Sequence, residues 1–225
     1  MINLYNKDNM EYIAPKQAQM IYADHIFENK DFSWIGRYWM FLADNGIFAI
    51  HTDHKLRADI EIYLRSLPKA EFVNDVITIQ RWGGVPKNKF AQKHDYILIY
   101  AKGKNWHWDS SGIQIDKVTT AKGFNPSGRT TKTPDACWED LGNFSTMSGE
   151  RVKKSDGKNI QWQKPLKQLR RLMTPFLKPG DFVIDPFLGS GTSAVIADEL
   201  GCDIDGIEID EKVFNLAKNR LNNLL

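Results

Sequence analysis

The stretch that most constrains the fold is FVIDPFLGSGTSAVIADELGCDIDGIEID, residues 182–210. It predicts a buried strand over 182–185, a glycine turn, a helix beginning near Thr192 and a second strand ending at Glu208. Glycines in the turn let the backbone approach a ligand, and the helix N-terminus offers free N–H groups. A carboxylate at the second strand end can accept hydrogen bonds from both ribose hydroxyls. The stretch predicts half of a nucleotide-binding unit; the structural alternative is a tight turn beside a solvated glutamate.

The spacing of the glycine turn narrows the choice of ligand. A dinucleotide-binding turn reads G-x-G-x-x-G, and here the sequence is G-S-G-T-S-A, with Ala194 in the last place. A Walker loop needs Gly-Lys-Ser/Thr, which this turn lacks, so nucleoside triphosphate hydrolysis is disfavoured. The residues alone leave open any adenosine-bearing ligand, including the dinucleotide of an oxidoreductase.

The rest of the chain alternates strand and helix patterns, which predicts a mostly parallel α/β sheet covered on both faces. Strands are expected at 2–6, 18–24, 47–53, 74–82 and 94–103, and helices at 32–46, 54–68, 163–180 and after 210. Residues 104–160 are rich in Gly, Ser, Thr and Lys without periodicity. We therefore expect one domain built from 1–103 and 161–225, with 104–160 as a small irregular inserted lobe.

Charge is unevenly distributed along this 225-residue chain, although its formal net charge is only +2. Residues 151–171 hold eight Lys or Arg against one Asp, whereas 181–211 hold nine acids and no Lys or Arg. This predicts a polyanion-facing side and a separate small-ligand side; the alternative is two solvated faces of opposite sign. The two cysteines, Cys137 and Cys202, match no metal or redox spacing. We expect a cytoplasmic protein with no metal and no membrane segment, because no apolar run approaches the ~20 residues of a span.

Two motifs carry a resemblance to a known family. DPFLGSGT after PGDFVI, with QKP some twenty residues upstream, resembles the S-adenosylmethionine site of the amino-group DNA methyltransferases. The order of the motifs is similar to that of the circularly permuted beta group, and HDYILIYAKG is a further match. The resemblance covers most of the chain outside 104–160. It implies a Rossmann-like seven-stranded methyltransferase sheet, circularly permuted, with an inserted target-recognition region and S-adenosyl-L-methionine as cofactor.

The resemblance also implies roles for individual residues around the cofactor. The residues expected to cradle the methionine part are Asp185, Phe187, Gly189 and Gly191, and Thr192 is also expected to bind the cofactor. Glu208 is expected to bind the ribose, and Lys164 and Pro165 belong to the segment that closes over the cofactor. Asp8 falls where the family contacts the adenine ring, although the usual Gly-Asp reads Lys7-Asp8 here.

The family's catalytic motif is an acidic or polar residue, two prolines and an aromatic, and it matches ADHIF. Asp24 and Phe27 match, while His25 and Ile26 replace the prolines. In this chemistry Asp24 accepts hydrogens from the exocyclic amine of a flipped base, which stacks on Phe27. Three hypotheses are consistent with this motif: an active enzyme, a cofactor-binding subunit without catalysis, and a changed reaction in which His25 acts as acid or base. An Asp at the first position favours adenine N6 over cytosine N4.

The inserted lobe is predicted to contact DNA. The stretch between YAKG and QKP, which includes the lobe, contains Trp106, Trp108, Trp138 and Trp162 among polar and basic residues. These rings either touch bases or form the lobe's own small core. The residues expected to bind nucleic acid are Arg81, Lys87, Lys89, Arg129, Arg151, Lys153 and Lys154. Because the lobe is short, a homodimer or a partner subunit is expected. The resemblance implies a prokaryotic or phage-encoded restriction-modification enzyme.

Overall fold

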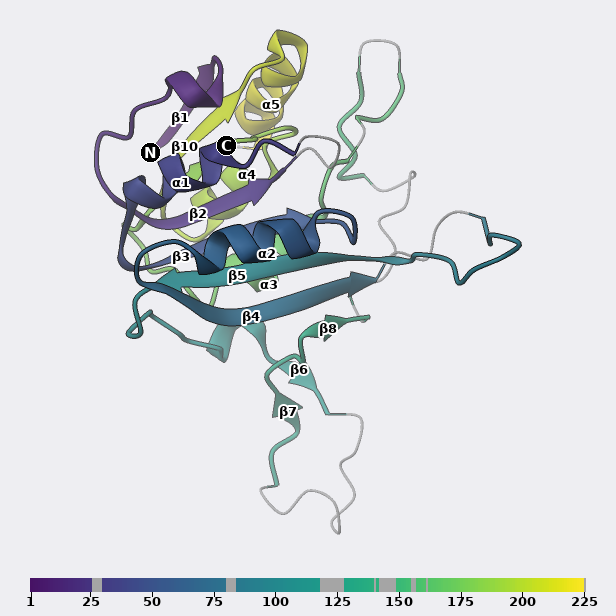
Figure 1. Cartoon of the computed structure of the whole chain (residues 1–225). Helices are drawn as coiled ribbons and strands as arrows, with labels where there is room; N and C mark the ends of the chain where they lie inside the picture. The colour runs from purple at the N-terminus through teal and green to yellow at the C-terminus, as the bar shows by residue number, and fades with distance from the viewer. Residues whose placement is uncertain are drawn as a thin grey trace.

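The computed structural model describes residues 1–25, 30–79, 84–117, 128–139, 141, 149–154, 157–160 and 162–224. Figure 1 shows helices packed against a large twisted sheet, with a thin lobe projecting from one end. The strands of the large sheet are β1 (Ile2–Asn6), β2 (Ala18–Asp24), β3 (Leu42–Thr52), β4 (Ala70–Ile79), β5 (His94–Lys102), β8 (Cys137–Trp138), β9 (Phe182–Asp185) and β10 (Asp203–Glu208). The helices are α1 (Ser33–Phe41), α2 (Arg57–Arg65), α3 (Leu166–Met173), α4 (Thr192–Glu199) and α5 (Glu211–Leu224), with short 3-10 turns at Asn9–Glu11 and Ser111–Ile113.

The large sheet has the order β1-β10-β9-β2-β3-β5-β4-β8. The neighbours from β1 to β3 are all parallel, whereas β5 runs antiparallel to both β3 and β4. The seven long strands match the predicted methyltransferase sheet, and the eighth, β8, is a two-residue strand contributed by the inserted segment. The α/β fold with a mostly parallel sheet is therefore confirmed.

Helices cover both faces of the sheet, because its strands are apolar on both sides. On one face, Ile35 of α1 and Ile60 of α2 pack against Ile21 and Phe48. On the other face, buried residues of α3, α4 and α5 pack against Met20 and neighbouring strand residues. Burial on both sides is what near-continuous apolar strands such as Phe182–Asp185 require.

Helix α1 is shorter than the predicted 32–46. It ends at Phe41, and β3 begins at once with Leu42. The Lys102 ammonium of β5 donates to the carbonyls of Trp39 and Leu42, at 3.0 and 2.8 Å. The helix end is thus satisfied by a side chain 60 residues away along the chain, a contact that local periodicity cannot report.

Part of the inserted segment joins the main domain. β8 pairs with β4, while β6 (Ile115–Asp116) and β7 (Thr131–Lys132) form a separate two-stranded sheet. The prediction that tryptophans form the lobe's own core is wrong for the two that are most enclosed. Trp138 is buried in the main core, and Trp106 packs against it. The reason is that β8, which carries Trp138, pairs with β4 at the edge of the large sheet.

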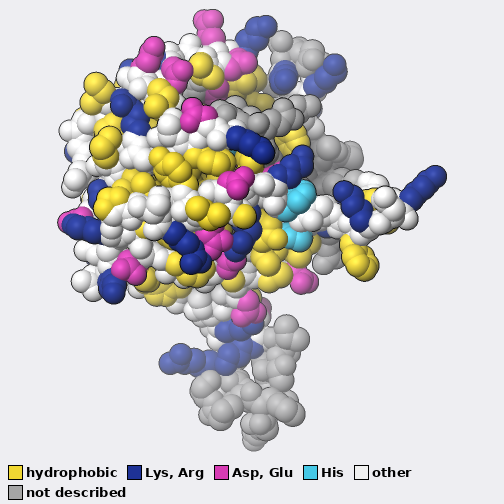
Figure 2. Space-filling view, in the orientation of Figure 1, with side chains coloured by type: hydrophobic (Ala, Val, Ile, Leu, Met, Phe, Trp, Pro, Cys, Tyr) yellow, Lys and Arg dark blue, Asp and Glu magenta, His cyan; other side chains and the backbone are white. Residues whose placement is uncertain are grey.

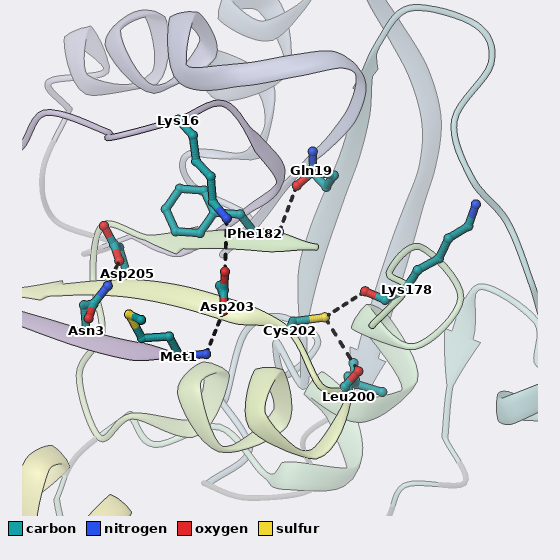
Figure 3. A network of polar contacts seen from close by, with 10 residues as sticks. All are labelled: Met1, Asn3, Lys16, Gln19, Lys178, Phe182, Leu200, Cys202, Asp203 and Asp205. Atoms are coloured by element: carbon teal, nitrogen blue, oxygen red, sulfur yellow. Dashed lines mark hydrogen bonds and ion pairs between the residues drawn. The ribbon is translucent and has the colours of Figure 1, made fainter. Parts of the chain in front are cut away.

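Polar side chains link the parallel strands at the amino edge of the sheet (Figure 3). Asn3 of β1 donates to Asp205 of β10 at 2.9 Å, and Lys16 reaches Asp203 at 3.0 Å. The Phe182 N–H of β9 donates to the Gln19 side chain of β2 at 2.8 Å. Asp205 is fully buried and also accepts from the Tyr12 hydroxyl, so its charge is compensated by hydrogen bonds.

Candidate active site

A pocket of about 510 Å³ opens at the carboxyl edge of the parallel strands. It extends from the glycine turn after β9 to the end of β2. Its lining includes Asp8, Asp24, Lys164, Asp185, Phe187, Gly189, Thr192 and Glu208, all of which were predicted from the sequence as site residues. Two predicted cofactor residues, Gly191 and Pro165, lie outside this lining.

The glycine turn is held to β10 by the carboxylate of Glu208. The Gly189 N–H donates to Glu208 Oε2 at 2.9 Å, and the Asp210 N–H donates to Oε1 at 2.9 Å. Gly189 and Gly191 have φ angles of +54° and +77°, which a side chain would strain. Gly191 is the N-cap residue of α4, and a Cβ there would lie 3.3 Å from that of Ala217. Gly191 therefore shapes the turn rather than lining the pocket.

Asp185 lies at the end of β9 and is almost completely buried. Its carboxylate accepts from the Phe187 N–H at 2.9 Å and, through a short hydrogen bond, from the Ser193 hydroxyl. The pKa of Asp185 is raised to about 7, chiefly by burial and less by the negative charges of Asp24 and Glu208, while its two hydrogen bonds act in the opposite direction. The carboxyl group can therefore change its charge close to neutral pH.

Asp24, at the end of β2, forms an ion pair with Lys164. The Lys164 ammonium lies 2.6 Å from Asp24 Oδ2, and both side chains are mostly buried. The Lys164 carbonyl accepts from the Thr192 hydroxyl at 3.1 Å, which ties this segment to the start of α4. Arg220 of α5 donates to the same hydroxyl and to the Ser190 carbonyl, both at 3.0 Å. Asp24 and Lys164 are thus connected to the start of α4 and to α5 by a series of polar contacts. Pro165 follows as the N-cap residue of α3.

His25, which follows Asp24 directly, lies in a packed aromatic cluster. It is almost completely buried and lies 5.3 Å from the ring of Trp34 and 5.5 Å from that of Phe187. The predicted catalytic Phe27 and the neighbouring Ile26 lie outside the described residues. The surroundings of His25 are therefore mainly aromatic rings.

Two residues near the site, His51 and Tyr22, were not singled out by the sequence, and a third, Trp162, was not predicted to line the pocket. His51 of β3 lies in register with Asp24 of β2, and its Nε2 atom is 3.6 Å from Asp95 Oδ2. Burial lowers the pKa of His51, and the positive charge of Lys164 lowers it further to a smaller extent. Tyr22 lines the pocket with a buried hydroxyl that makes no hydrogen bond within the part of the chain that the structure describes. Trp162 lines the pocket, although its sequence context indicates only a lobe tryptophan. The one sequence signal for His51 is that it directly follows the apolar run IFAI, residues 47–50.

The predicted DNA-binding residues lie in three places. Lys87 and Lys89 are exposed on the hairpin between β4 and β5, and Figure 2 shows basic side chains on this projecting arm. Arg129 is exposed beside β7, in the lobe. The third group comprises Arg151, Lys153 and Lys154, which precede α3. Arg81 lies outside the described residues.

The predicted separation of basic and acidic segments is only partly present. Lys154, from the basic stretch, lines the same pocket as Asp185 and Glu208 from the acidic stretch. Arg170 of α3 forms an ion pair with Glu199 of α4 at 2.7 Å, so the basic stretch meets the acidic one directly. The reason is that α3 and α4 pack side by side on the same face of the sheet. The basic stretch therefore does not form one continuous polyanion-facing side.

Carboxylates lie around the glycine turn, where they suit cationic or hydroxyl groups of a ligand. The pocket lining contains the four carboxylates of Asp8, Asp24, Asp185 and Glu208 and three lysines, one of which, Lys164, is paired with Asp24. A pyrophosphate at the glycine turn would face Asp185 and Glu208, which argues against a dinucleotide. Among the described residues, no cluster of His, Cys, Asp or Glu is arranged to hold a metal ion, and no helix is long and apolar enough to cross a membrane.

Comparisons with known proteins agree with this geometry. Residues 15–219 match the family model of N6 and N4 methylases, described as DNA methylase. A type II methyltransferase of Haemophilus influenzae, M.HinfI, is 38% identical over 159 residues, which are 68% of this chain and 40% of that relative. The alignments with three curated relatives cover between 29% and 58% of their lengths, so this chain corresponds to part of them.

Two solved structures share the fold. The M1.HpyAVI–SAM complex superposes with a TM-score of 0.74 at 23% identity, covering 99% of this chain and 100% of that one. The cytosine-N4-specific PvuII DNA methyltransferase gives 0.72 at 12% identity, covering 97% and 86%. Since the family model spans nearly the whole chain, the protein belongs to the N6/N4 DNA methylase family of amino-methyltransferases.

Proposed function

We propose that this chain transfers a methyl group from S-adenosylmethionine to an exocyclic amine of a flipped DNA base, with adenine N6 as the target. The observation that carries the proposal is the single pocket that joins Asp24 to the glycine turn and Glu208. A donor and an acceptor of a methyl group must meet in one cavity, and these two groups of residues lie at its two ends.

The pocket suits S-adenosylmethionine in size and charge. Its volume of about 510 Å³ falls within the roughly 300–1,000 Å³ of small-molecule sites. The carboxylates of Asp8, Asp185 and Glu208 complement the two cationic groups and the ribose hydroxyls of this cofactor. Each Glu208 oxygen already accepts one backbone N–H and keeps lone pairs for a ligand. Tyr22 also lines the pocket, and its buried hydroxyl makes no hydrogen bond within the described residues.

The chemistry at the other end of the pocket falls to Asp24. The bound cofactor supplies a methyl group activated by a sulfonium. A base amine is a weak nucleophile, because its lone pair is delocalised into the ring. The Asp24 carboxylate accepts a hydrogen of the amine and makes the lone pair available, while the Lys164 ammonium fixes the direction of the carboxylate. Carboxylate oxygens have about four lone-pair sites in total, so Asp24 can hold Lys164 and an amine together.

We assign His25 to packing rather than to proton transfer, since its ring lies among Trp34, Phe32 and Phe187. Close packing then replaces the rigidity that two prolines give to the family motif. Adenine is the proposed target because the first catalytic position is Asp24. The shared fold of a cytosine-N4-specific enzyme leaves cytosine as the alternative.

The proposed DNA contacts are the exposed lysines of the β4–β5 hairpin and the basic residues of the insert. They would bind phosphates, position the duplex and carry no sequence information themselves. A second copy of the chain or a partner subunit would supply further contacts to the duplex, because the inserted lobe is short.

The test is methyl transfer to DNA from an unmethylated source, using cofactor labelled in the methyl group. Mass spectrometry of the nucleosides separates N6-methyladenine from N4-methylcytosine. We expect N6-methyladenine with the wild type and none with Asp24→Ala, whose cofactor affinity should be unchanged. A wild-type chain that binds cofactor and DNA without transferring the methyl group would instead be the non-catalytic subunit. A labelled product at any other atom would mean a changed reaction.

A further inference from the structure

Trp162 is strongly exposed to solvent and also lines the active-site pocket. Its relative solvent exposure is 74%, among the largest values for an apolar residue in the described part of the chain. It nevertheless borders the same cavity as Asp24 and Lys164. An indole that lines a pocket and is also in contact with water presents a flat apolar surface, and aromatic faces of this kind stack on planar ligands.

The backbone at Trp162 holds the ring in this position at a cost. Its φ angle is +63°, in the left-handed region that a bulky residue rarely adopts. Of the described non-glycine residues only Asn45 and Lys69 share this feature, and Asn tolerates it well. Strain of this type persists where the surroundings enforce it, and it gathers at binding sites.

The two residues that follow Trp162 supply that enforcement. The buried side chain of Gln163 accepts from the Val152 N–H at 2.8 Å and donates to the Glu150 carbonyl at 2.7 Å. Lys164 is fixed to Asp24, and its ammonium also lies 3.4 Å from the Trp162 carbonyl. With the next two residues anchored, the backbone at Trp162 is held in the left-handed conformation and the residue is held beside the pocket.

From these contacts we infer that Trp162 is a stacking platform for a planar nucleobase entering the pocket. The inference rests on the proposed function and extends it to a residue that the catalytic and cofactor motifs do not contain. The target base is the expected partner, because the Trp162 carbonyl, Lys164 and Asp24 form one chain of contacts that ends at the carboxylate receiving the amine. The adenine ring of the cofactor is also a planar nucleobase, so the experiment must distinguish stacking on the target base from stacking on the cofactor.

The experiment compares four variants. Trp162→Ala removes the ring and keeps the strained φ, whereas Trp162→Gly removes the ring and relieves the strain. Trp162→Phe keeps an aromatic face. Trp108→Ala is the matched control, since this half-exposed tryptophan packs on Phe176 and lies outside the pocket. Thermal unfolding of every variant confirms that each one folds.

Two affinities are measured for each variant: that of S-adenosylmethionine by calorimetry, and that of a single-stranded oligodeoxyadenylate by fluorescence anisotropy. Neither measurement needs turnover. We expect Trp162→Ala and Trp162→Gly to bind the oligonucleotide about 5- to 160-fold more weakly, the range for one base–aromatic stack. Trp162→Phe should restore most of the affinity, and Trp108→Ala should match the wild type.

Each outcome has a separate meaning. A loss of cofactor affinity alone would overturn the target base and assign the stack to the cofactor adenine. Unchanged affinities in both ring-removing variants would overturn the inference entirely, while methyl transfer to DNA would continue to support the proposed function. If the wild type transfers no methyl group but its oligonucleotide affinity depends on Trp162, the proposed function fails and the stacking platform stands.

Discussion

Asp185→Asn should change how stability depends on pH. In the folded chain burial raises the pKa of Asp185 from 3.8 to about 7, so the folded state keeps its proton to a higher pH than the unfolded state. Stability from this group is therefore fully present below about pH 4 and is lost as the pH rises to about 7. One pKa unit corresponds to about 1.4 kcal/mol, so from about pH 5 to about pH 8 the wild type should lose about 2 to 3 kcal/mol.

Asparagine keeps the local contacts without the charge. Its oxygen can accept from the Phe187 N–H, and its amide can donate to the Ser193 hydroxyl. Relative to the wild type, Asp185→Asn should gain about 2 to 3 kcal/mol of unfolding free energy between those two pH values. Its cofactor affinity should fall, since a carboxylate is removed from the pocket, an exchange of function for stability.

Urea unfolding at a series of pH values measures this difference directly. The exposed Asp198, on α4, provides a matched control in Asp198→Asn, which removes a carboxylate that is not buried. Comparing variants at each pH cancels the contribution of His51 and other groups. Parallel stability curves for the wild type and Asp185→Asn from about pH 5 to about pH 8 would refute the reasoning, because they would mean that Asp185 stays ionised in the folded protein.

Three further outcomes are expected. Glu208→Ala should weaken S-adenosylmethionine binding by about 1.5–3 kcal/mol, the cost of hydrogen bonds to a charged group, and calorimetry showing full affinity would remove Glu208 from the site. Reversing the charges of Lys87 and Lys89 should weaken binding to all DNA sequences alike and lower the slope of the salt dependence by about one unit for each phosphate that is no longer neutralised; an unchanged slope would place DNA elsewhere. Gly191→Ala should cost about 1–2 kcal/mol in unfolding experiments, because its φ of +77° suits only glycine, and unaltered stability would contradict that strain.

Much of the segment expected to bind the cofactor, residues 182–210, could be predicted from local sequence. The strands β9 and β10 and the glycine turn lie in one continuous stretch, so Asp185, Gly189 and Glu208 are near one another along the chain as well as in space. Strand ends also predict the position of Asp24 at the same edge of the sheet, because parallel strands all present their carboxyl ends there.

The remaining features depend on contacts between distant residues. The end of α1 is set by Lys102, and the place of Trp138 is set by the pairing of β8 with β4. Trp162 has no periodic neighbours, and its exposed position follows from the hydrogen bonds of Gln163 to Glu150 and Val152. No pattern within a short window contains such information, so the sequence alone assigns these tryptophans to the lobe.

The pairing of β1 with β10 has a consequence for biosynthesis. Asn3 and Asp205 are partners across the sheet although 202 residues separate them. A ribosome adds about 5–20 residues per second, so β1 waits roughly 10 to 40 seconds before its neighbour exists. Throughout that interval β1 is an unpaired strand that can associate with other nascent chains. Folding yield should therefore depend on the speed of translation and on chaperones that shield the first segment, even though β1 lies at the edge of the finished sheet.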